Sequence, residues 1–576
     1  MLLFELADAL ERLEETRSRL TMVERVAELL SRSGRSERAS IVYLLQARLR
    51  PDYEGIEVGL GEKLLVRALA EAYRVSEAAV RRRFRSSGDL GRVAESLAPG
   101  PARGRATVRR AYDTLLQIAR TSGAGSLQKK MALLADLLRS VGGREAKLLV
   151  RIAQGKLRLG LGDQTILEAA ALGAFGDRRK KKLLEHAYNV RSDLGNVVCL
   201  AFDKGERALA RVGPELGVPV RPALAQRLPT AAAIITRLGS VHVEPKYDGF
   251  RLQLHRDGSR VWAFSRRLEN VTPMFPELTA ALRRQLRTRR AIIEGEAIAH
   301  NPETGEFQPF QVTMTRKRKT RVSEMAERYP LRLFTFDILY AGRRNCIPDP
   351  LRERARRLRK VLPFKEDSAV AVTESTIAKN AKELQAYFDD MIARGLEGVV
   401  AKRPDSPYQA GARGFDWVKL KRSYQSRLRD TVDVVLVGYL RGRGKRASLG
   451  IGSLLGAVYD PSHDRFRTVA KIGSGLSDAA WKQLRARLDE DATARKPARV
   501  ESILTPDVWV EPRLVVEVLA DEITRSPFHT CGKSGDAPGY ALRFPRMLDG
   551  VRADKSPTDA TTQREIIQMH KQQRRS

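Results

Sequence analysis

The chain has 576 residues, which is too long for one hydrophobic core, and typical domain sizes predict about three or four domains. Its composition, 42% hydrophobic and 30% charged, is that of a soluble protein, and the absence of a bilayer-length apolar run excludes a membrane-spanning class. Lysine and arginine outnumber aspartate and glutamate by 104 to 69, so the formal charge of +35 predicts a polyanionic partner, most simply nucleic acid. An arginine-rich proteome would account for only part of this excess.

Cysteine use and the first residues indicate the compartment. Cys199, Cys346 and Cys531 lie far apart without a CxxC pair, so they predict neither a disulfide framework nor a zinc site. Glu5 and Asp8 interrupt the apolar segment that a secretion signal would need. We therefore expect a cytoplasmic protein, associated with the nucleoid if the source is prokaryotic.

Residues 1–212 are predicted to form an all-α domain. Leucines recur at three- and four-residue steps in 3–13 and 133–138, the period of amphipathic helices. Basic clusters at 81–85 and 178–182 would each be ordinary solvated helix faces, but together with the net charge they favour contacts to a phosphate backbone. Since no helix-turn-helix or zinc-finger signature is present, we expect binding to follow duplex shape rather than base sequence.

A mixed α/β domain is predicted at 213–424. Its first part, 213–229, is rich in proline and glycine and is interpreted as a linker. Short β-rich runs then alternate with helical segments. The strand candidates are 241–255, 261–264, 291–299, 331–339 and 398–402.

The third predicted domain, 425–560, contains about five strand-like runs separated by turns. This number and size suit a small barrel such as an OB-fold, a frequent platform for nucleic acid. The tail, 561–576, is polar and basic and is predicted to be disordered or a single frayed helix. The fold class is therefore multidomain α+β. The predicted strands of the barrel are 432–438, 453–459, 466–472, 508–510 and 515–519.

The segment 241–255, VHVEPKYDGFRLQLH, alternates as half-buried strands do and is interrupted at Asp248-Gly249. Glycine accepts positive φ, so the simplest interpretation is a hairpin that carries Lys246 on its surface. In the alternative interpretation, Glu244, Lys246, Asp248 and Arg251 converge around a bound anion or nucleotide. The spacing within this segment does not decide between the two.

Two candidate phosphate loops fail the Walker A pattern, G-x-x-x-x-G-K-[ST]. Gly444-Lys445 is followed by Arg446, and Gly532-Lys533-Ser534 has Pro527 where the pattern needs glycine. The sequence therefore excludes a P-loop nucleotidase.

Six short motifs follow one another in one order. A single motif carries little weight, because each residue also has an ordinary structural explanation, but the ordered set resembles the covalent nucleotidyltransferases. Lys246 to Arg251 resembles their K-x-D-G-x-R motif. The other five are Ser265-Arg266, Phe334-Thr-Phe336-Asp337, Glu397-Gly-Val-Val-Ala-Lys402, Trp417-Val-Lys419-Leu-Lys421 and Arg543-Phe-Pro-Arg546.

Further segments narrow the resemblance to the ATP-dependent DNA ligases of the archaeal and eukaryotic replicative type. They are 308–312, 316–319 and 508–512, together with 157–161, LRLGL, in the helical domain. The resemblance covers nearly the whole chain. It implies a DNA-binding domain, an adenylation domain and an OB-fold domain in that order.

The resemblance also implies the reaction and the site. ATP would be the substrate, Mg²⁺ or Mn²⁺ the metal, and nicked double-stranded DNA the partner. Lys246 would be the nucleophile, and cationic neighbours or a metal favour the neutral amine that such a lysine needs. Glu296 and Glu397 are hard oxygen ligands that suit Mg²⁺. Nucleotide contacts are implied for Glu244 with the adenine amine, Phe336 with the base, and Arg251, Arg266, Glu296, Lys402, Lys419, Lys421, Arg543 and Arg546.

Other functions compete with this interpretation. The nearest is an RNA ligase or a capping guanylyltransferase, and one of another class is a non-catalytic DNA-binding protein. The large helical domain and Glu244 favour DNA and ATP, while the lysine and acidic motifs argue for an enzyme. We expect a monomer whose three domains encircle the nick. Gln563 and Ile566 lack the paired aromatics of a sliding-clamp peptide, so no clamp partner is predicted.

Overall fold

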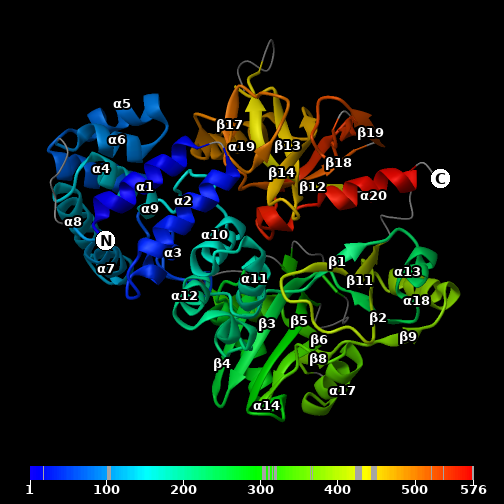
Figure 1. The fold of residues 1–576 in the computed structure, drawn as a ribbon. Coiled ribbons are helices and arrows are strands. Elements are labelled where there is room, and N and C mark those ends of the chain that lie inside the picture. The colour runs from blue at the N-terminus through cyan, green and yellow to red at the C-terminus, as the bar shows by residue number, and fades with distance from the viewer. Residues whose placement is uncertain are drawn as a thin grey trace.

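The computed structural model describes residues 1–16, 18–99, 106–300, 307–308, 312–313, 316, 321–363, 365, 368–421, 431–442, 450–520, 522–535 and 537–573. Within these ranges no helix has the length and apolar character needed to cross a membrane. Figure 1 shows a helical N-terminal domain, a central α/β domain and a C-terminal β domain. The predicted fold class is confirmed.

The N-terminal domain is a stack of helices around a leucine-rich core. Its leucine periodicity places Leu6, Leu10 and Leu13 on one buried face of the first helix. Side-chain oxygens cap several helices, as Ser76 does for α5 and Thr107 for α7. The helices are α1 Leu3–Glu15, α2 Arg19–Arg32, α3 Arg38–Leu45, α4 Glu62–Tyr73, α5 Glu77–Ser87, α6 Leu90–Leu97, α7 Val108–Arg120, α8 Ser126–Arg139, α9 Gly143–Ala153, α10 Asp163–Phe175, α11 Lys181–Val190 and α12 Leu194–Ala210.

The segment predicted as a linker is instead a packed joint between the first two domains. Val220 is fully buried, and residues 224–227 form strand β1 (Leu224–Arg227), which pairs in parallel with β11 (Arg413–Lys421). Arg221 anchors the joint, because its Nη2 lies 3.0 Å from Asp163 Oδ2 and 2.6 Å from the Tyr188 hydroxyl. The proline content concealed this short strand, whose ladder partner lies far along the chain.

The central domain contains two sheets that meet at the candidate site. The six-stranded sheet has the order β4-β3-β5-β6-β7, with β8 beside β6, and the five-stranded sheet has the order β1-β11-β10-β2-β9. The strands are β2 Val241–Lys246, β3 Phe250–Asp257, β4 Arg260–Ser265, β5 Arg290–Ala299, β6 Leu331–Ala341, β7 Arg344–Asn345, β8 Val370–Val372, β9 Thr376–Ala378 and β10 Gly398–Lys402. The helices are α13 Ala231–Leu238, α14 Pro276–Gln285, α16 Val322–Arg328, α17 Leu351–Val361 and α18 Ala381–Ala393.

The hairpin interpretation of 241–255 is wrong. Strands β2 and β3 belong to different sheets and do not pair with each other, so Asp248-Gly249 carries the chain from one sheet to the other. Gly249 is not among the residues with positive φ. It is needed for close packing, since a Cβ there would lie 2.4 Å from the carbonyl oxygen of Ala297 on β5.

The C-terminal domain is built on an eight-stranded sheet that includes all five predicted strands. A bridge between Ser474 and Arg546 joins the end of β14 to β21, as in a small barrel. Of the two alternatives predicted for the tail, the single helix is correct: residues 563–573 form α20, which buries Ile566 in the domain core. The elements are β12 Thr431–Leu440, β13 Ser453–Asp460, β14 Arg465–Ile472, α19 Asp478–Glu490, β15 Ala492–Thr493, β16 Val500–Glu501, β17 Val508–Val510, β18 Val515–Leu519, β19 Glu522–Ser526, β20 Gly539–Arg543, β21 Arg546–Val551 and α20 Gln563–Gln573.

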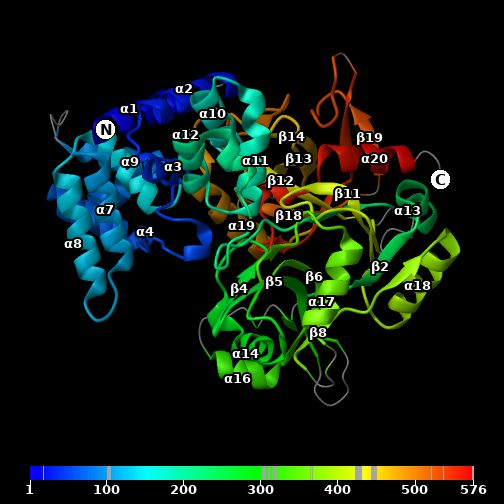
Figure 2. The ribbon, with the colours of Figure 1, turned by 60° about the horizontal axis from the view of Figure 1, so that its bottom comes forward.

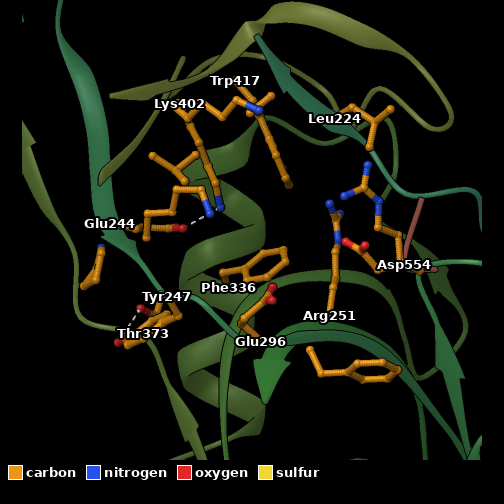
Figure 3. A pocket seen from close by; sticks show the side chains of 18 of the residues that line it. Leu224, Glu244, Tyr247, Arg251, Glu296, Phe336, Thr373, Lys402, Trp417 and Asp554 are labelled. Atoms are coloured by element: carbon orange, nitrogen blue, oxygen red, sulfur yellow. Dashed lines mark hydrogen bonds and ion pairs between the residues drawn. The ribbon is translucent and has the colours of Figure 1, made fainter. Parts of the chain in front are cut away.

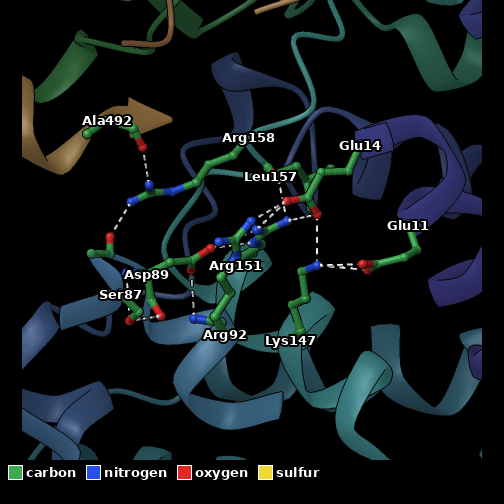
Figure 4. Close-up of polar contacts among 12 residues, drawn as sticks. Glu11, Glu14, Ser87, Asp89, Arg92, Lys147, Arg151, Leu157, Arg158 and Ala492 are labelled. Atoms are coloured by element: carbon green, nitrogen blue, oxygen red, sulfur yellow. Dashed lines mark hydrogen bonds and ion pairs between the residues drawn. The ribbon is translucent and has the colours of Figure 1, made fainter. Parts of the chain in front are cut away.

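The helical domain also contacts the C-terminal domain through the loop between α9 and α10 (Figures 1 and 2). This loop contains the segment 157–161. Arg158 donates to the carbonyl oxygens of Gly88 at 2.9 Å and Glu490 at 3.0 Å, and also to that of Ala492 (Figure 4). Lys156 pairs with Asp491 at 2.9 Å. The contact therefore rests on cations at the end of α19, where helix carbonyls lack partners.

Candidate active site

A cavity of about 230 Å³ opens between the two sheets of the central domain (Figure 3). Strands β2, β10 and β11 contribute one wall, and β3, β5 and β6 contribute another. Asp554 of the C-terminal domain also lines it. Of the residues predicted for the site, those that line this cavity are Glu244, Lys246, Arg251, Arg266, Glu296, Phe336, Lys402 and Lys419.

Lys246 ends β2, and its position follows from the alternation of that strand. Val241 and Val243 pack into the apolar core under the sheet, which leaves the even-numbered side chains for the opposite face. The ladder places Lys246 opposite Gly398, the residue after Glu397. The Glu397 carboxylate accepts ion pairs from both Lys246 and Lys421.

Glu397 is held as an anion by these two lysines. Burial alone would raise the pKa of Glu397, but the Lys246 and Lys421 ammonium groups together hold it well below its usual range. A carboxylate in this state is a weak base. Its charge and its oxygens hold both lysine ammonium groups at one point.

Gly398 lets three strands approach one another at this point. Its φ is 149°, which side chains rarely adopt, and a Cβ there would lie 2.1 Å from the carbonyl oxygen of Leu420 on β11. The glycine of the predicted E-G-x-x-x-K motif therefore has a backbone reason. It brings Lys246 and Lys421 to the same carboxylate.

Glu244 and Lys402 form a buried ion pair in the wall of the cavity, with Lys402 Nζ 2.6 Å from Glu244 Oε2 (Figure 3). Lys402 Nζ also lies 4.6 Å from the centre of the Phe336 ring and 4.3 Å from that of Trp417. Burial opposes ionisation of Glu244, but Lys402 and His242 hold its pKa below the ordinary value. An anion and an aromatic surface thus lie side by side, as recognition of a nucleobase requires.

Arg251 extends from β3 into the cavity and is fixed by several polar partners. Its Nη2 lies 2.8 Å from Glu294 Oε2, and its Nη1 donates to the carbonyl oxygen of Ala223 at 2.7 Å. The Tyr408 hydroxyl donates to the same Glu294 oxygen at 2.6 Å. Glu294, which lies two residues before Glu296 on β5, therefore fixes the guanidinium of Arg251.

Two other carboxyl groups at the site, Glu296 and Asp248, have raised pKa values, in contrast to Glu397 and Glu244. Burial, with the nearby Asp248 carboxylate adding to it, raises the pKa of Glu296 to about 7. Burial and the Glu397 carboxylate likewise raise the pKa of Asp248. Neither Glu296 nor Asp248 forms an ion pair with another described residue.

The other predicted cations contact the C-terminal domain. Arg266 lies 3.5 Å from Asp559, which precedes α20. Burial and the neighbouring cations Arg227, Lys421 and Lys555 lower the pKa of Lys419 well below its ordinary value.

The comparisons with known proteins agree with the order of the domains. Three family models match the chain: DNA ligase N terminus over residues 2–171, ATP dependent DNA ligase domain over 222–421, and ATP dependent DNA ligase C terminal region over 447–555. A probable DNA ligase of Dictyoglomus thermophilum is 48% identical over 575 residues, which cover 100% of this chain and 98% of that protein. The chain belongs to the ATP-dependent DNA ligase family.

An archaeal ligase supports the same assignment. The DNA ligase of Aeropyrum pernix is 42% identical over 592 residues, covering 99% of this chain and 98% of its own. A solved mycobacterial DNA ligase D complexed with ATP and MES is 25% identical and covers 59% of this chain, with a TM-score of 0.33. The predicted resemblance to archaeal ligases is confirmed by the full-length relatives.

Arg543 and Arg546, the last motif predicted for the ligase site, lie outside the cavity. Arg543 ends β20 and pairs with Glu522 at 3.2 Å, and Arg546 begins β21. Both side chains are exposed. The segments 308–312 and 316–319 fall largely outside the described residues.

Sequence reasoning did not assign roles to several residues that line the cavity. Trp417 stands opposite Lys402 in the ladder and shares a strand with Lys419 and Lys421 at steps of two, so the period of that strand was sufficient to find it. Arg413, which donates to Glu565 at 2.8 Å, begins the same strand at the same parity, but the predicted strand motif started only at Trp417. Asp554, which reaches the cavity from another domain, had no local signal.

Proposed function

We propose that the chain seals nicks in double-stranded DNA with ATP, through a covalent adenylate on Lys246. The observation that carries the proposal is that Lys246 lines one cavity together with Glu244, Arg251 and Phe336. The formal charge of +35 supports a polyanionic substrate beyond the nucleotide.

In the first step, the Nζ of Lys246 attacks the α-phosphorus of ATP. A nitrogen–phosphorus bond forms while the bond from that phosphorus to the bridging oxygen breaks, and pyrophosphate leaves with the electron pair. Lys246 must lose a proton before it attacks. Because Glu397 is a weak base, the proton leaves to solvent, and Glu397 keeps the amine oriented until the nucleotide arrives.

The cavity suits recognition of adenine. Glu244 is an acceptor for the amino group of the base, and Phe336 offers an aromatic face against which the base stacks. Arg251 and Arg266 provide donors for the ribose and phosphates. The rigid support of Arg251 by Glu294 and Tyr408 fits a residue that positions a substrate.

The carboxyl groups fit a divalent cation. Burial raises the pKa of both Glu296 and Asp248, and a cation would oppose this shift by stabilising the ionised forms. Mg²⁺ or Mn²⁺ would be held by Glu296 and Glu397, and when bound it neutralises charge on the phosphates. Within the described part of the chain, no group of three or more such ligands is preassembled, so phosphate oxygens would complete the coordination.

Two further transfers complete the reaction. The AMP passes from Lys246 to the 5′-phosphate of the nick, and the 3′-hydroxyl then displaces AMP to form the phosphodiester. Lys402, Lys419 and Lys421 stabilise charge on the phosphates in these steps. Arg543 and Arg546 orient the triphosphate only after the C-terminal domain has turned towards the cavity, because both lie outside it in the present arrangement.

Labelling with α-³²P-ATP and Mg²⁺ tests the proposal. The wild-type chain takes a covalent, acid-labile label, and Lys246→Ala takes none. Lys382→Ala, which alters an exposed lysine on α18 of the same domain, is the matched control and labels normally. A wild-type chain that takes no label refutes the proposed reaction and favours a non-catalytic DNA-binding protein.

Two comparisons separate the remaining alternatives. Label from α-³²P-GTP in preference to ATP would indicate a capping guanylyltransferase, and sealing of nicked RNA in preference to nicked DNA would indicate an RNA ligase. We expect ATP to be preferred in the first comparison and nicked duplex DNA in the second. We also expect a monomer by light scattering, with no sliding clamp required for sealing.

A further inference from the structure

His242 stands beneath Glu244 on β2 and is not part of any ligase motif quoted above. It is buried, with 7% of its surface exposed, and its Nε2 lies 3.1 Å from Glu244 Oε1. The other carboxylate oxygen, Oε2, is taken by Lys402 at 2.6 Å. Glu244 is therefore gripped at both oxygens by side chains from two neighbouring strands.

The ionised state of Glu244 shows which partner donates the hydrogen bond between His242 and Glu244. The positive charge of Lys402 and the hydrogen bond from His242 keep Glu244 ionised, and an ionised carboxylate only accepts hydrogen bonds. The Nε2 of His242 consequently carries the hydrogen. The ladder explains how it reaches Glu244, because His242 lies opposite Lys402 and both project from the face that carries Glu244.

These two contacts leave Glu244 able to accept one further hydrogen bond from the cavity. A carboxylate has about four lone-pair sites, so two contacts leave room for a third on the side that lines the cavity. A glutamate side chain has three rotatable bonds. Without His242, nothing on β2 would stop its carboxylate from turning towards Lys402 alone.

We propose that His242 is a positioning residue that makes Glu244 select adenine over guanine, an inference that rests on the nucleotide role of Glu244 proposed above. Adenine presents an amino donor at C6, whereas guanine presents a carbonyl acceptor there. A carboxylate oxygen fixed against that position attracts the donor and repels the acceptor. A carboxylate free to turn away loses both effects.

A pair of amide substitutions tests the contact. The amide nitrogen of His242→Gln can occupy the place of Nε2, whereas the shorter side chain of His242→Asn cannot reach Glu244. The measurement is kcat/KM for covalent labelling with ATP and with GTP, together with thermal unfolding of each variant. His255→Gln is the control, since His255 is a fully buried histidine of the same domain that bonds to Gly217 and Gln253 instead.

We expect His242→Asn to lower the ratio of kcat/KM for ATP over GTP about tenfold, mainly through KM for ATP. His242→Gln stays within about threefold of the wild type. His255→Gln leaves the ratio unchanged whatever its effect on unfolding. The inference is overturned if His242→Asn leaves the ATP/GTP ratio unaltered, or if His242→Gln lowers the ratio as far as His242→Asn does. In either case covalent labelling of the wild type still upholds the proposed reaction. A wild type without label overturns both.

Discussion

Glu296 is predicted to destabilise the folded chain at neutral and alkaline pH. Burial, to which Asp248 adds, raises the pKa of Glu296 from 4.5 to about 7 despite three nearby cations. Between these pH values the unfolded chain releases a proton that the folded chain keeps, so stability falls as pH rises through the window. Below about pH 4.5 the carboxyl is protonated in both states, and the penalty is absent.

The magnitude follows from the shift. Each pKa unit corresponds to about 1.4 kcal/mol, so the full penalty above pH 7 is at most about 3.5 kcal/mol. Partial exposure of the side chain reduces this to about 2 kcal/mol. Glu296→Gln places a neutral amide of the same shape there. It should stabilise the central domain by about 2 kcal/mol at pH 8 and by less than about 1 kcal/mol at pH 5.

Scanning calorimetry of the full chain from pH 5 to pH 8.5 measures this difference. The expected rise in Tm at pH 8 is about 4–8 °C if the central domain unfolds as one unit. Glu294→Gln is the matched control on the same face of β5. It removes the negative charge that pairs with Arg251 and replaces one of the two acceptor oxygens by a donor, so it should destabilise the domain throughout. A Glu296→Gln variant that is less stable than wild type, or whose advantage does not grow with pH, would refute the reasoning.

Three further predictions follow from other contacts. Gly249→Ala places a Cβ 2.4 Å from the Ala297 carbonyl oxygen, so it should cost about 2 kcal/mol or more in urea unfolding and reduce Lys246 labelling, unlike Gly213→Ala, whose Cβ would approach no atom beyond its chain neighbours closer than 3.8 Å. Arg158→Ala removes the carbonyl contacts to α19 and should raise the radius of gyration in X-ray scattering by about 2 Å or more above the roughly 25 Å of a compact chain, whereas Arg92→Ala should not. Replacing Arg82, Arg83 and Arg85 on α5 by alanine should flatten the slope of log affinity for duplex DNA against log salt by up to about 3, and an unchanged slope would remove α5 from the DNA path.

Much of the candidate site could be proposed from the sequence because its residues lie in short local motifs. Most of these motifs lie on or beside strands of the central domain, and a period of two selects the side chains that share a face, as for Lys419 and Lys421 on β11. The last motif, at 543–546, instead joins β20 to β21 of the C-terminal domain. The sequence did not reveal the register of β10 against β2 and β11. This register allows Glu397 to pair with both Lys246 and Lys421.

The errors have a common physical source in contacts between segments distant in sequence. Asp248-Gly249 has the composition of a hairpin turn, but glycine is needed at 249 because a Cβ there would collide with the backbone of β5, about fifty residues further on. Residues 213–229 have the composition of a linker, but β1 is held by β11 from the end of the domain. For the polar tail, composition left two alternatives open, and the helix forms because the core of the C-terminal domain accepts Ile566. Local composition carries no information on such partners.

The charges of the cavity favour the proposed metal-bound nucleotide over a simple anion as its ligand. Three of its cations, Lys402, Lys246 and Arg251, each have a carboxylate partner. Glu296 in the cavity wall and the exposed Asp248 beside it have no ion-pair partner among the described residues, and desolvation and neighbouring carboxylates raise the pKa of both. An anion alone would add to the repulsion from those carboxylates. In the proposed reaction, a polyphosphate that arrives with a divalent cation would neutralise these carboxyls and compete with Glu397 for the lysines, which would free Lys246 from its ion pair as the nucleotide enters.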